Sequence, residues 1–147
     1  MSFMDSILSG GGRPDTFNRQ EGYVGILIAI VAADGVISKE EVIDFHSAIK
    51  KATILKGAAS EYLSKIIDKC LRTLDTKGMD ELIRLCSEGL STDIYEGVFA
   101  TACDMVFSDG NVDPKEVAVM DKIKANLKIN DQFARDCAEV FKAKSAV

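Results

Sequence analysis

The sequence predicts an all-α fold, a compact bundle of about seven helices built from two helical repeats that are related by an approximate two-fold axis. Beyond Pro14, apolar residues recur at the i, i+3, i+4 and i+7 spacing of amphipathic helices. The chain has only 2 prolines, both at expected element starts, and no segment alternates as a strand would. A similar acidic loop sequence also occurs twice, as "AADGVISKEE" at 32–41 and "FSDGNVDPKE" at 107–116.

Length and composition narrow the class of protein. The 147 residues suffice for one domain with a core, and 47% hydrophobic with 28% charged residues is an ordinary globular composition. A net charge of −5 with scattered basic residues argues against a nucleic-acid partner, because phosphate binding needs clustered lysine and arginine. The longest apolar run, 22–33, is shorter than the roughly 20 residues of a transmembrane helix. We therefore expect a buried core helix there and no transmembrane segment.

Two segments of unequal size are expected. Residues 1–15 carry a few apolar side chains before a glycine triplet, which predicts a flexible or short amphipathic N-terminal segment. Residues 16–147 form a single helical domain, with repeat one at about 16–90 and repeat two at about 91–147. The N-terminus has no basic region followed by an apolar block, so no secretion signal is expected.

Apolar stripes locate the helices of this domain. In chain order they run over Val24–Val31, Val42–Ile49, Tyr62–Leu74, Leu82–Cys86, Val98–Val106, Val117–Leu127 and Phe133–Phe141. Short breaks separate them, such as "LKG", "TKG" and "SDGN". The 4 cysteines lie on or beside the stripes and form no CxxC pair, so we expect reduced core thiols rather than disulfides or a metal–thiolate site.

The repeat extends upstream of the acidic loops. Aligning Asp34 with Asp109 matches small residues on one side of each preceding helix. The matched pairs are Gly22 with Gly97, Gly25 with Ala100, Ala29 with Asp104 and Ala33 with Ser108. Because small residues let helix backbones approach closely, these two helices are expected to cross through these faces.

Helix capping can explain many of the acidic residues in the two loops. "SKEE" is typical of a capping box, with Ser38 as the N-cap and Glu41 reaching back from the third position. "DPKE" repeats the pattern with Asp113 and Glu116, and Pro114 suits the first helical position. Capping alone could account for these acids.

A cation site is the other interpretation. Each loop reads like the second half of a calcium loop, with a glycine, Gly35 or Gly110, at the sharp turn. Neither loop is a complete EF-hand, because residues such as Met105 and Phe107 occupy the first ligand positions. If the two-fold axis brings the loops together, their carboxylates could converge on one ion, and hard oxygen ligands suit Ca²⁺, Mg²⁺ or Mn²⁺. Both interpretations stay open.

At these residues the chain resembles the tellurite resistance TerB family, from "MSF" through "AADGVISKEE" and "SDGNVDPKE" to the last helix. The resemblance implies an all-helical, cytoplasmic, non-enzymatic stress-response protein of the ter system. It also implies a membrane-associated TerC-like partner at the inner face of the membrane, and TerD-like partners. It carries expected cation ligands onto Asp34, Glu40, Glu41, Asp109, Asp113 and Glu116.

Two residues depart from this pattern. Lys115 stands at the position that matches Glu40, so the second loop has lost one carboxylate. Asp104 is outside the family pattern. It is included in the predicted metal site because it interrupts the row of small residues on its helix, which is a feature of this sequence alone. The candidate ions for this site are Ca²⁺, Mg²⁺, Mn²⁺ and Zn²⁺.

Three functions follow from these features. The first is a helical interaction module whose acidic loops bind a divalent cation or a basic partner segment. The second is a purely structural scaffold whose loop acids only cap helices. The third is a thiol-dependent enzyme that processes tellurite. This last function is disfavoured, because no cysteine or serine has an evident partner in His46, the only histidine, and no glycine loop resembles a phosphate cradle.

Overall fold

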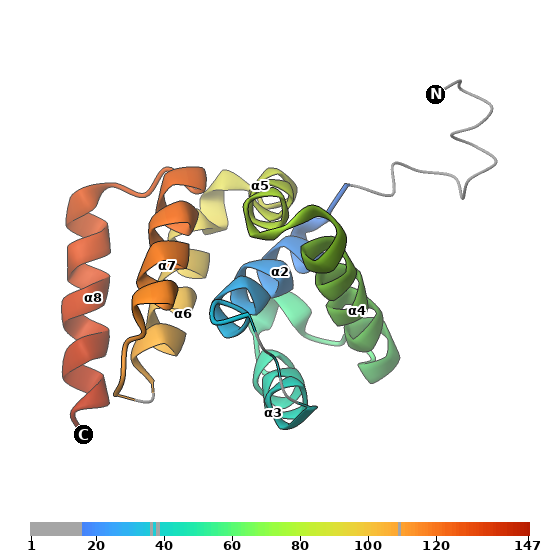
Figure 1. The fold of residues 1–147 in the computed structure, drawn as a ribbon, viewed down its shortest axis with the longest axis horizontal. Coiled ribbons are helices and arrows are strands. Elements are labelled where there is room, and N and C mark those ends of the chain that lie inside the picture. Colours follow the sequence, from blue (N-terminus) through green and yellow to red (C-terminus); the bar gives the residue numbers. More distant parts are fainter. Residues whose placement is uncertain (1–15, 36, 38, 109) are drawn as a thin grey trace.

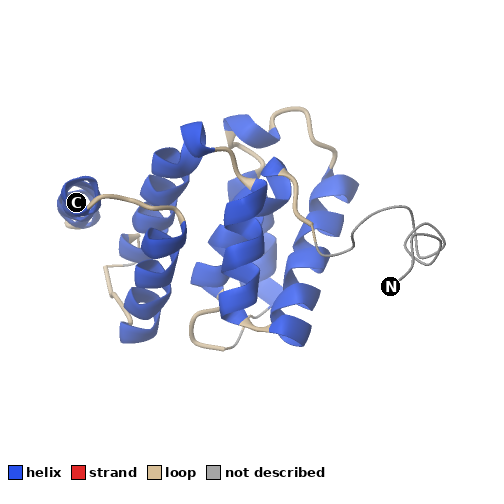
Figure 2. Cartoon of the chain, turned by 90° about the horizontal axis from the view of Figure 1, so that it is seen from above, coloured by secondary structure: helices blue, strands red, loops and turns tan. Residues whose placement is uncertain are grey.

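The computed structural model describes residues 16–35, 37, 39–108 and 110–147, without the side chains at 40, 41, 44 and 47. All regular secondary structure in these residues is helical, as Figure 2 shows. The predicted all-α class is therefore confirmed. The predicted N-terminal segment 1–15 lies outside the described residues.

Each predicted apolar stripe falls largely within one helix. In chain order the elements are α2 Arg19–Val31, α3 Lys39–Ile49, the 3-10 helix η1 Thr53–Leu55, α4 Ser60–Lys77, α5 Met79–Gly89, the 3-10 helix η2 Thr92–Ile94, α6 Tyr95–Phe107, α7 Pro114–Asn126 and α8 Asp131–Ser145. Short turns join most of the helices. Among successive helices, α4 packs against α5 and α6 packs against α7, whereas α8 packs against α6 (Figure 1).

Helix α2 is the central element of the bundle. It packs against α4, α5, α6 and α7, and its residues from Gly22 to Ile30 are all buried. In Figure 1 it lies between α4 and α6, with α5 and α3 on opposite sides. A helix that is apolar on every side is one that neighbours must surround. The prediction of a buried core helix over 22–33 is confirmed for this part of the run.

The predicted crossing of the two small-residue faces is wrong. A Cβ atom placed on Gly22 would lie 2.6 Å from the carbonyl oxygen of Cys86 in α5. A Cβ on Gly25 would collide with the Cys86 sulfur, so α5 occupies the glycine face of α2. A Cβ on Gly97 would meet nothing within 4 Å. Small residues permit a close approach, but the connectivity of the chain puts α5 rather than α6 there.

Helix α6 meets α2 through another face and carries α8 on its outer side. Tyr23 of α2 lies near Thr101 of α6, and both line the same groove. On the far side, the Phe99 and Phe133 rings pack with centroids 6.4 Å apart, and α8 forms the edge of the bundle in Figure 1. An edge helix buries a narrow stripe, and Val140 is accordingly 61% exposed. Its assignment to the buried stripe was wrong.

Candidate functional site

The second acidic loop forms the capping box that the sequence predicts. Asp113 is the N-cap of α7, and its Oδ1 accepts a hydrogen bond of 2.7 Å from the Lys115 backbone N–H. Glu116 Oε1 accepts a hydrogen bond of 3.1 Å from the Asp113 backbone N–H. Pro114 occupies the first turn. Both acids thus satisfy helix N–H groups that would otherwise lack partners.

The first loop is described only in part. Gly35 has φ +87° and Gly110 has φ +77°, the left-handed conformation expected of both turn glycines. Ser38 and Asp109 lie outside the described residues. Glu40 and Glu41 lie in the first turn of α3, but their side chains are not described. The capping box of "SKEE" therefore stays a prediction.

A further capping box begins α2 and was not predicted. Asn18 Oδ1 accepts a hydrogen bond of 2.8 Å from the Glu21 backbone N–H, and Glu21 Oε1 accepts one of 2.8 Å from the Asn18 backbone N–H. The signal was present as "NRQE", which has the same spacing as "DPKE". The Glu21 carboxylate also forms an ion pair of 2.9 Å with Lys69 of α4, which fixes the start of α2.

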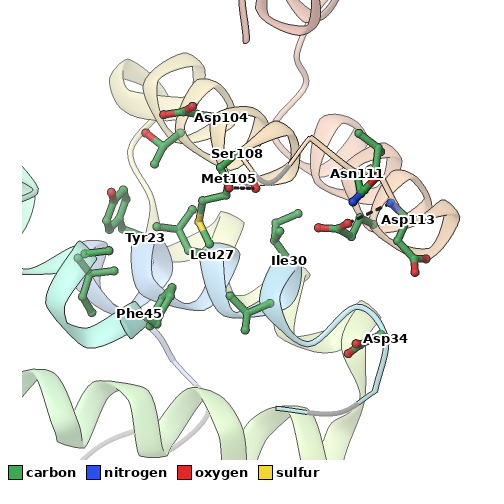
Figure 3. A pocket seen from close by; sticks show the side chains of 16 residues that line it. Tyr23, Leu27, Ile30, Asp34, Phe45, Asp104, Met105, Ser108, Asn111 and Asp113 are labelled. Atoms are coloured by element: carbon green, nitrogen blue, oxygen red, sulfur yellow. Dashed lines mark hydrogen bonds between the residues drawn. The ribbon is translucent and has the colours of Figure 1, made fainter. Parts of the chain in front are cut away.

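A groove of about 790 Å³ is lined by residues of α2, α3, α6 and the start of α7 (Figure 3). The floor of this groove is apolar. Its principal side chains are Tyr23, Leu27, Ile30, Val31, Phe45 and Met105. These residues belong to stripes that the sequence assigns to the core or flank them, and Tyr23, Leu27, Ile30 and Phe45 are indeed buried. Periodicity cannot show that a groove opens beside them. The groove is the functional feature that sequence reasoning missed.

Acids from both halves of the chain form the rim of this groove. Asp34 follows α2, Asp104 lies on α6, and Asp113 and Glu116 begin α7. Figure 3 places Asp104 above the Tyr23 end of the floor and places Asp34 and Asp113 beyond its other end. No lysine or arginine is among the described residues that line the groove. The groove therefore combines an apolar floor with a negative rim.

Asp104 already has a cationic partner. The Nζ atom of Lys144 in α8 lies 3.2 Å and 3.3 Å from the two carboxylate oxygens of Asp104. The Lys144 side chain is 66% exposed and the Asp104 side chain 39% exposed, so this ion pair contributes little to stability. The ion pair shows that a lysine ammonium group can bind the Asp104 carboxylate at the rim of the groove.

The described acids do not form a metal centre by themselves. Within the part of the chain that the structure describes, no group of three histidine, cysteine, aspartate or glutamate side chains is placed to hold a metal ion together. Asp34 and Asp113 lie on opposite sides of the groove in Figure 3. Asp109 and the side chains of Glu40 and Glu41 are outside this statement, so the predicted cation site stays a prediction.

The four cysteines are buried and free, as residues of the helix interfaces. Burial raises the pKa of the Cys70 thiol to about 12, with the nearby Glu21 carboxylate adding to the effect. Burial also raises the pKa of Cys103 to about 11, and that of Cys86 well above its ordinary value. Reactive cysteines have lowered pKa values, so these thiols have the character of core residues.

The fold and the groove define the class of protein: a small all-helical protein with an acid-rimmed cleft. The family model of the tellurite resistance protein TerB matches residues 20–139, and the chain belongs to that family. No curated protein and no solved structure gave a match. None of the described helices combines the length and apolar composition needed to cross a membrane.

Proposed function

We propose that this protein is a non-enzymatic binding module of the tellurite-resistance system, and that it holds a segment of a partner protein in the groove between α2, α3, α6 and α7. The observation that carries this proposal is that acids from α6, from the start of α7 and from the loop after α2 line one groove together with apolar side chains. A membrane-associated TerC-like protein and TerD-like proteins are the proposed partners. The protein would then work in the cytoplasm, at the inner face of the membrane when it binds the former.

The chemistry of the groove supports binding. An apolar floor stabilises a complex by removing apolar surface of the partner from water. A charged rim contributes the choice of partner and the rate of association more than raw affinity. The partly exposed Val31 and Met105, with the exposed Ala48 and Val112, provide the apolar surface, and the aspartates at the rim provide the charge.

The proposal that the protein is not an enzyme is supported by the state of the cysteine thiols and of the single histidine. Each cysteine is buried with a raised pKa, the reverse of what an attacking or tellurite-binding thiolate needs. His46 is half-buried on α3, with its Nε2 atom 3.4 Å from the Ser60 carbonyl oxygen. No described nucleophile is paired with it as a catalytic base would be.

Blocking the groove tests the proposal. Ala48 of α3 lines the groove and is exposed, so Ala48→Trp adds bulk there without displacing core atoms. Ala118 of α7 is also exposed but does not line the groove, so Ala118→Trp is the matched control. Binding of purified TerC-like and TerD-like proteins should weaken at least about tenfold in Ala48→Trp and stay unchanged in Ala118→Trp. Equal binding by both variants would overturn the proposed site.

A divalent cation is a second candidate ligand. It is favoured by one observation: Asp34 and the Asp113–Glu116 pair, from the two acidic loops, line the same groove. Carboxylates are the ligands that Ca²⁺, Mg²⁺ and Mn²⁺ prefer, and Zn²⁺ also accepts them. The structural scaffold is the remaining alternative, in which these acids only cap helices.

Calorimetry separates these alternatives. Ca²⁺, Mg²⁺, Mn²⁺ and Zn²⁺ would be titrated into metal-free protein and into the Asp34→Asn/Asp109→Asn variant. Saturable binding in the wild type alone would support a cation at the loops. If no ion binds while both proteins remain folded, the cation is excluded. The scaffold then predicts a change in stability alone when the acids are neutralised, and the binding module predicts loss of the partner.

A further inference from the structure

We infer that Cys70 and Cys86 form an intramolecular disulfide when the protein meets a peroxide, and that this bond fixes α4 to α5 at their junction with α2. Neither cysteine is among the residues that line the groove, so the bond does not depend on the proposed function. Three features carry the inference: the positions of the two sulfur atoms, their burial and the close packing around them.

The two sulfur atoms meet where three helices join. Cys70 lies on α4 and Cys86 on α5, and these helices pack against each other and against α2. A Cβ atom placed on Gly25 of α2 would collide with the Cys86 sulfur and would lie 3.3 Å from the Cys70 sulfur. Because both are so close to one point, the two sulfur atoms lie less than about 6 Å apart, and a disulfide needs about 2 Å. We expect rotation of the two side chains to close this gap.

Burial keeps the pair reduced while the helices are closed. Both cysteines are 0% exposed, and the Cys70 thiol donates a hydrogen bond of 3.8 Å to the Glu21 backbone carbonyl oxygen of α2. Burial also raises the pKa of both thiols, so both are protonated at neutral pH and react slowly. Oxidation therefore begins when α4 or α5 separates locally from α2 and peroxide reaches one sulfur.

One molecule of hydrogen peroxide oxidises the pair by two electrons. The first sulfur attacks a peroxide oxygen and breaks the O–O bond, which gives a sulfenic acid, and the displaced hydroxide leaves with the thiol proton as water. The second sulfur attacks the sulfenic sulfur, forms the S–S bond and displaces hydroxide, which leaves with the second thiol proton as water. Each sulfur is oxidised by one electron, and both peroxide oxygens are reduced to water.

The close packing selects the disulfide among the oxidised states of cysteine. Sulfenic and sulfinic acids add polar oxygen atoms, and an adduct with glutathione adds a whole peptide. The junction has no room for such groups beside Gly25, where even one added carbon atom would collide with the Cys86 sulfur. A disulfide adds no atoms, loses two hydrogens and carries no charge, so the helices can close around it at little cost.

The disulfide joins the two helices that hold α2 on its glycine side. A cross-link restricts the unfolded chain and suppresses the local separation of α4 from α5. Because α2 also lines the groove, the bond fixes one wall of the groove as well. The oxidised protein is therefore the more rigid form, and a thiol reductant returns it to the reduced form.

Peptide mapping of the wild-type chain tests the inference. Purified reduced protein would be exposed to hydrogen peroxide at neutral pH, its remaining thiols blocked, and its disulfide-linked peptides identified by mass spectrometry. The Cys70–Cys86 pairing should be at least about tenfold more abundant than any other pairing, because only correctly placed sulfur atoms can bond. Dithiothreitol should restore both thiols. A different dominant pairing, sulfinic acid at these two cysteines, or folded protein that forms no disulfide would overturn the inference.

Two double variants test whether the bond fixes the helices. Cys103→Ala/Cys137→Ala retains the proposed pair, and the matched control Cys70→Ala/Cys86→Ala retains the two cysteines of α6 and α8. Oxidation should raise the Tm of the first variant by about 5 °C or more and leave that of the control unchanged. An equal rise in both variants, or no rise in the first, would contradict the proposed cross-link. The mapping of the wild-type chain decides whether the bond forms even if a variant does not fold.

Discussion

At the scale of single residues, Gly22 and Gly97, which the sequence alignment of the two acidic loops brings into register, have very different surroundings. A Cβ atom on Gly22 would lie 2.6 Å from the Cys86 carbonyl oxygen, a backbone atom of α5 that cannot move unless the helix moves. Gly97 is exposed in the first turn of α6, and a Cβ there would meet nothing within 4 Å. The same substitution should therefore have opposite effects at these two positions.

We expect Gly22→Ala to destabilise the protein and Gly97→Ala to leave it unchanged or more stable. Overpacking costs about 1–3 kcal/mol, and replacing glycine by alanine in a helix returns at most about 1 kcal/mol. For Gly97→Ala only the second effect applies. The free energy of unfolding, measured in urea by circular dichroism, checks both. A Gly22→Ala variant as stable as the wild type would contradict the close contact of α2 with α5.

At the scale of helices, the start of α7 serves both the fold and the rim of the groove. Asp113 caps the helix with one carboxylate oxygen, which accepts the Lys115 N–H. Asparagine is as good an N-cap as aspartate but carries no charge, whereas alanine provides neither the cap nor the charge. Substitutions at this one position can therefore separate capping from binding.

We expect Asp113→Ala to lower the free energy of unfolding by about 1 kcal/mol, and Asp113→Asn to change it by only a few tenths. If the rim recognises a basic partner, both variants should bind that partner more weakly. Urea unfolding and partner binding would be measured on the same preparations. Unchanged partner binding by Asp113→Asn would assign this residue to capping alone.

The order and type of the helices could be predicted from the sequence, because the apolar period is local information. Every predicted stripe lies largely in an observed helix, and the "DPKE" box is formed as expected. The pairing of helices could not be predicted. The glycines of α2 fit any close neighbour, and only the path of the chain places Cys86 against them. Val140 shows the same limit, since a stripe does not reveal that its helix lies at an edge.

At the scale of the whole molecule, the assignment of the acids to a cation site stays a prediction. The repeat identified the acids, and the structure places Asp34, Asp104, Asp113 and Glu116 around one groove. The groove could not be foreseen, because Leu27 is a buried core residue and nothing in its sequence pattern shows that it also lines a groove. Whether an apolar side chain faces a neighbour or a groove depends on the separation of α2 from α6, which is a property of the assembled bundle.

The buried thiols give the fold a dependence on alkaline pH. Burial raises the pKa of Cys70 to about 12 and that of Cys103 to about 11, whereas an unfolded thiol titrates at about 8.5. The unfolded state therefore loses these protons first. Stability from the thiols is complete below the unfolded pKa and is lost as the pH rises toward the folded values. Between pH about 8 and about 10, the free energy of unfolding should fall more in the wild type than in Cys70→Ala/Cys103→Ala.

The same burial predicts how the thiols react. In native protein at neutral pH, a thiol-specific reagent should label the 4 cysteines only as fast as the protein opens, and all of them at once in urea. The Cys70→Ala/Cys103→Ala variant would assign any rapid phase to a particular pair. A thiol that reacts rapidly in the folded protein, before any opening, would be accessible and activated, which is the opposite of what burial and the raised pKa values indicate. That result would restore the thiol-dependent enzyme as a candidate and would weaken the case for a binding module.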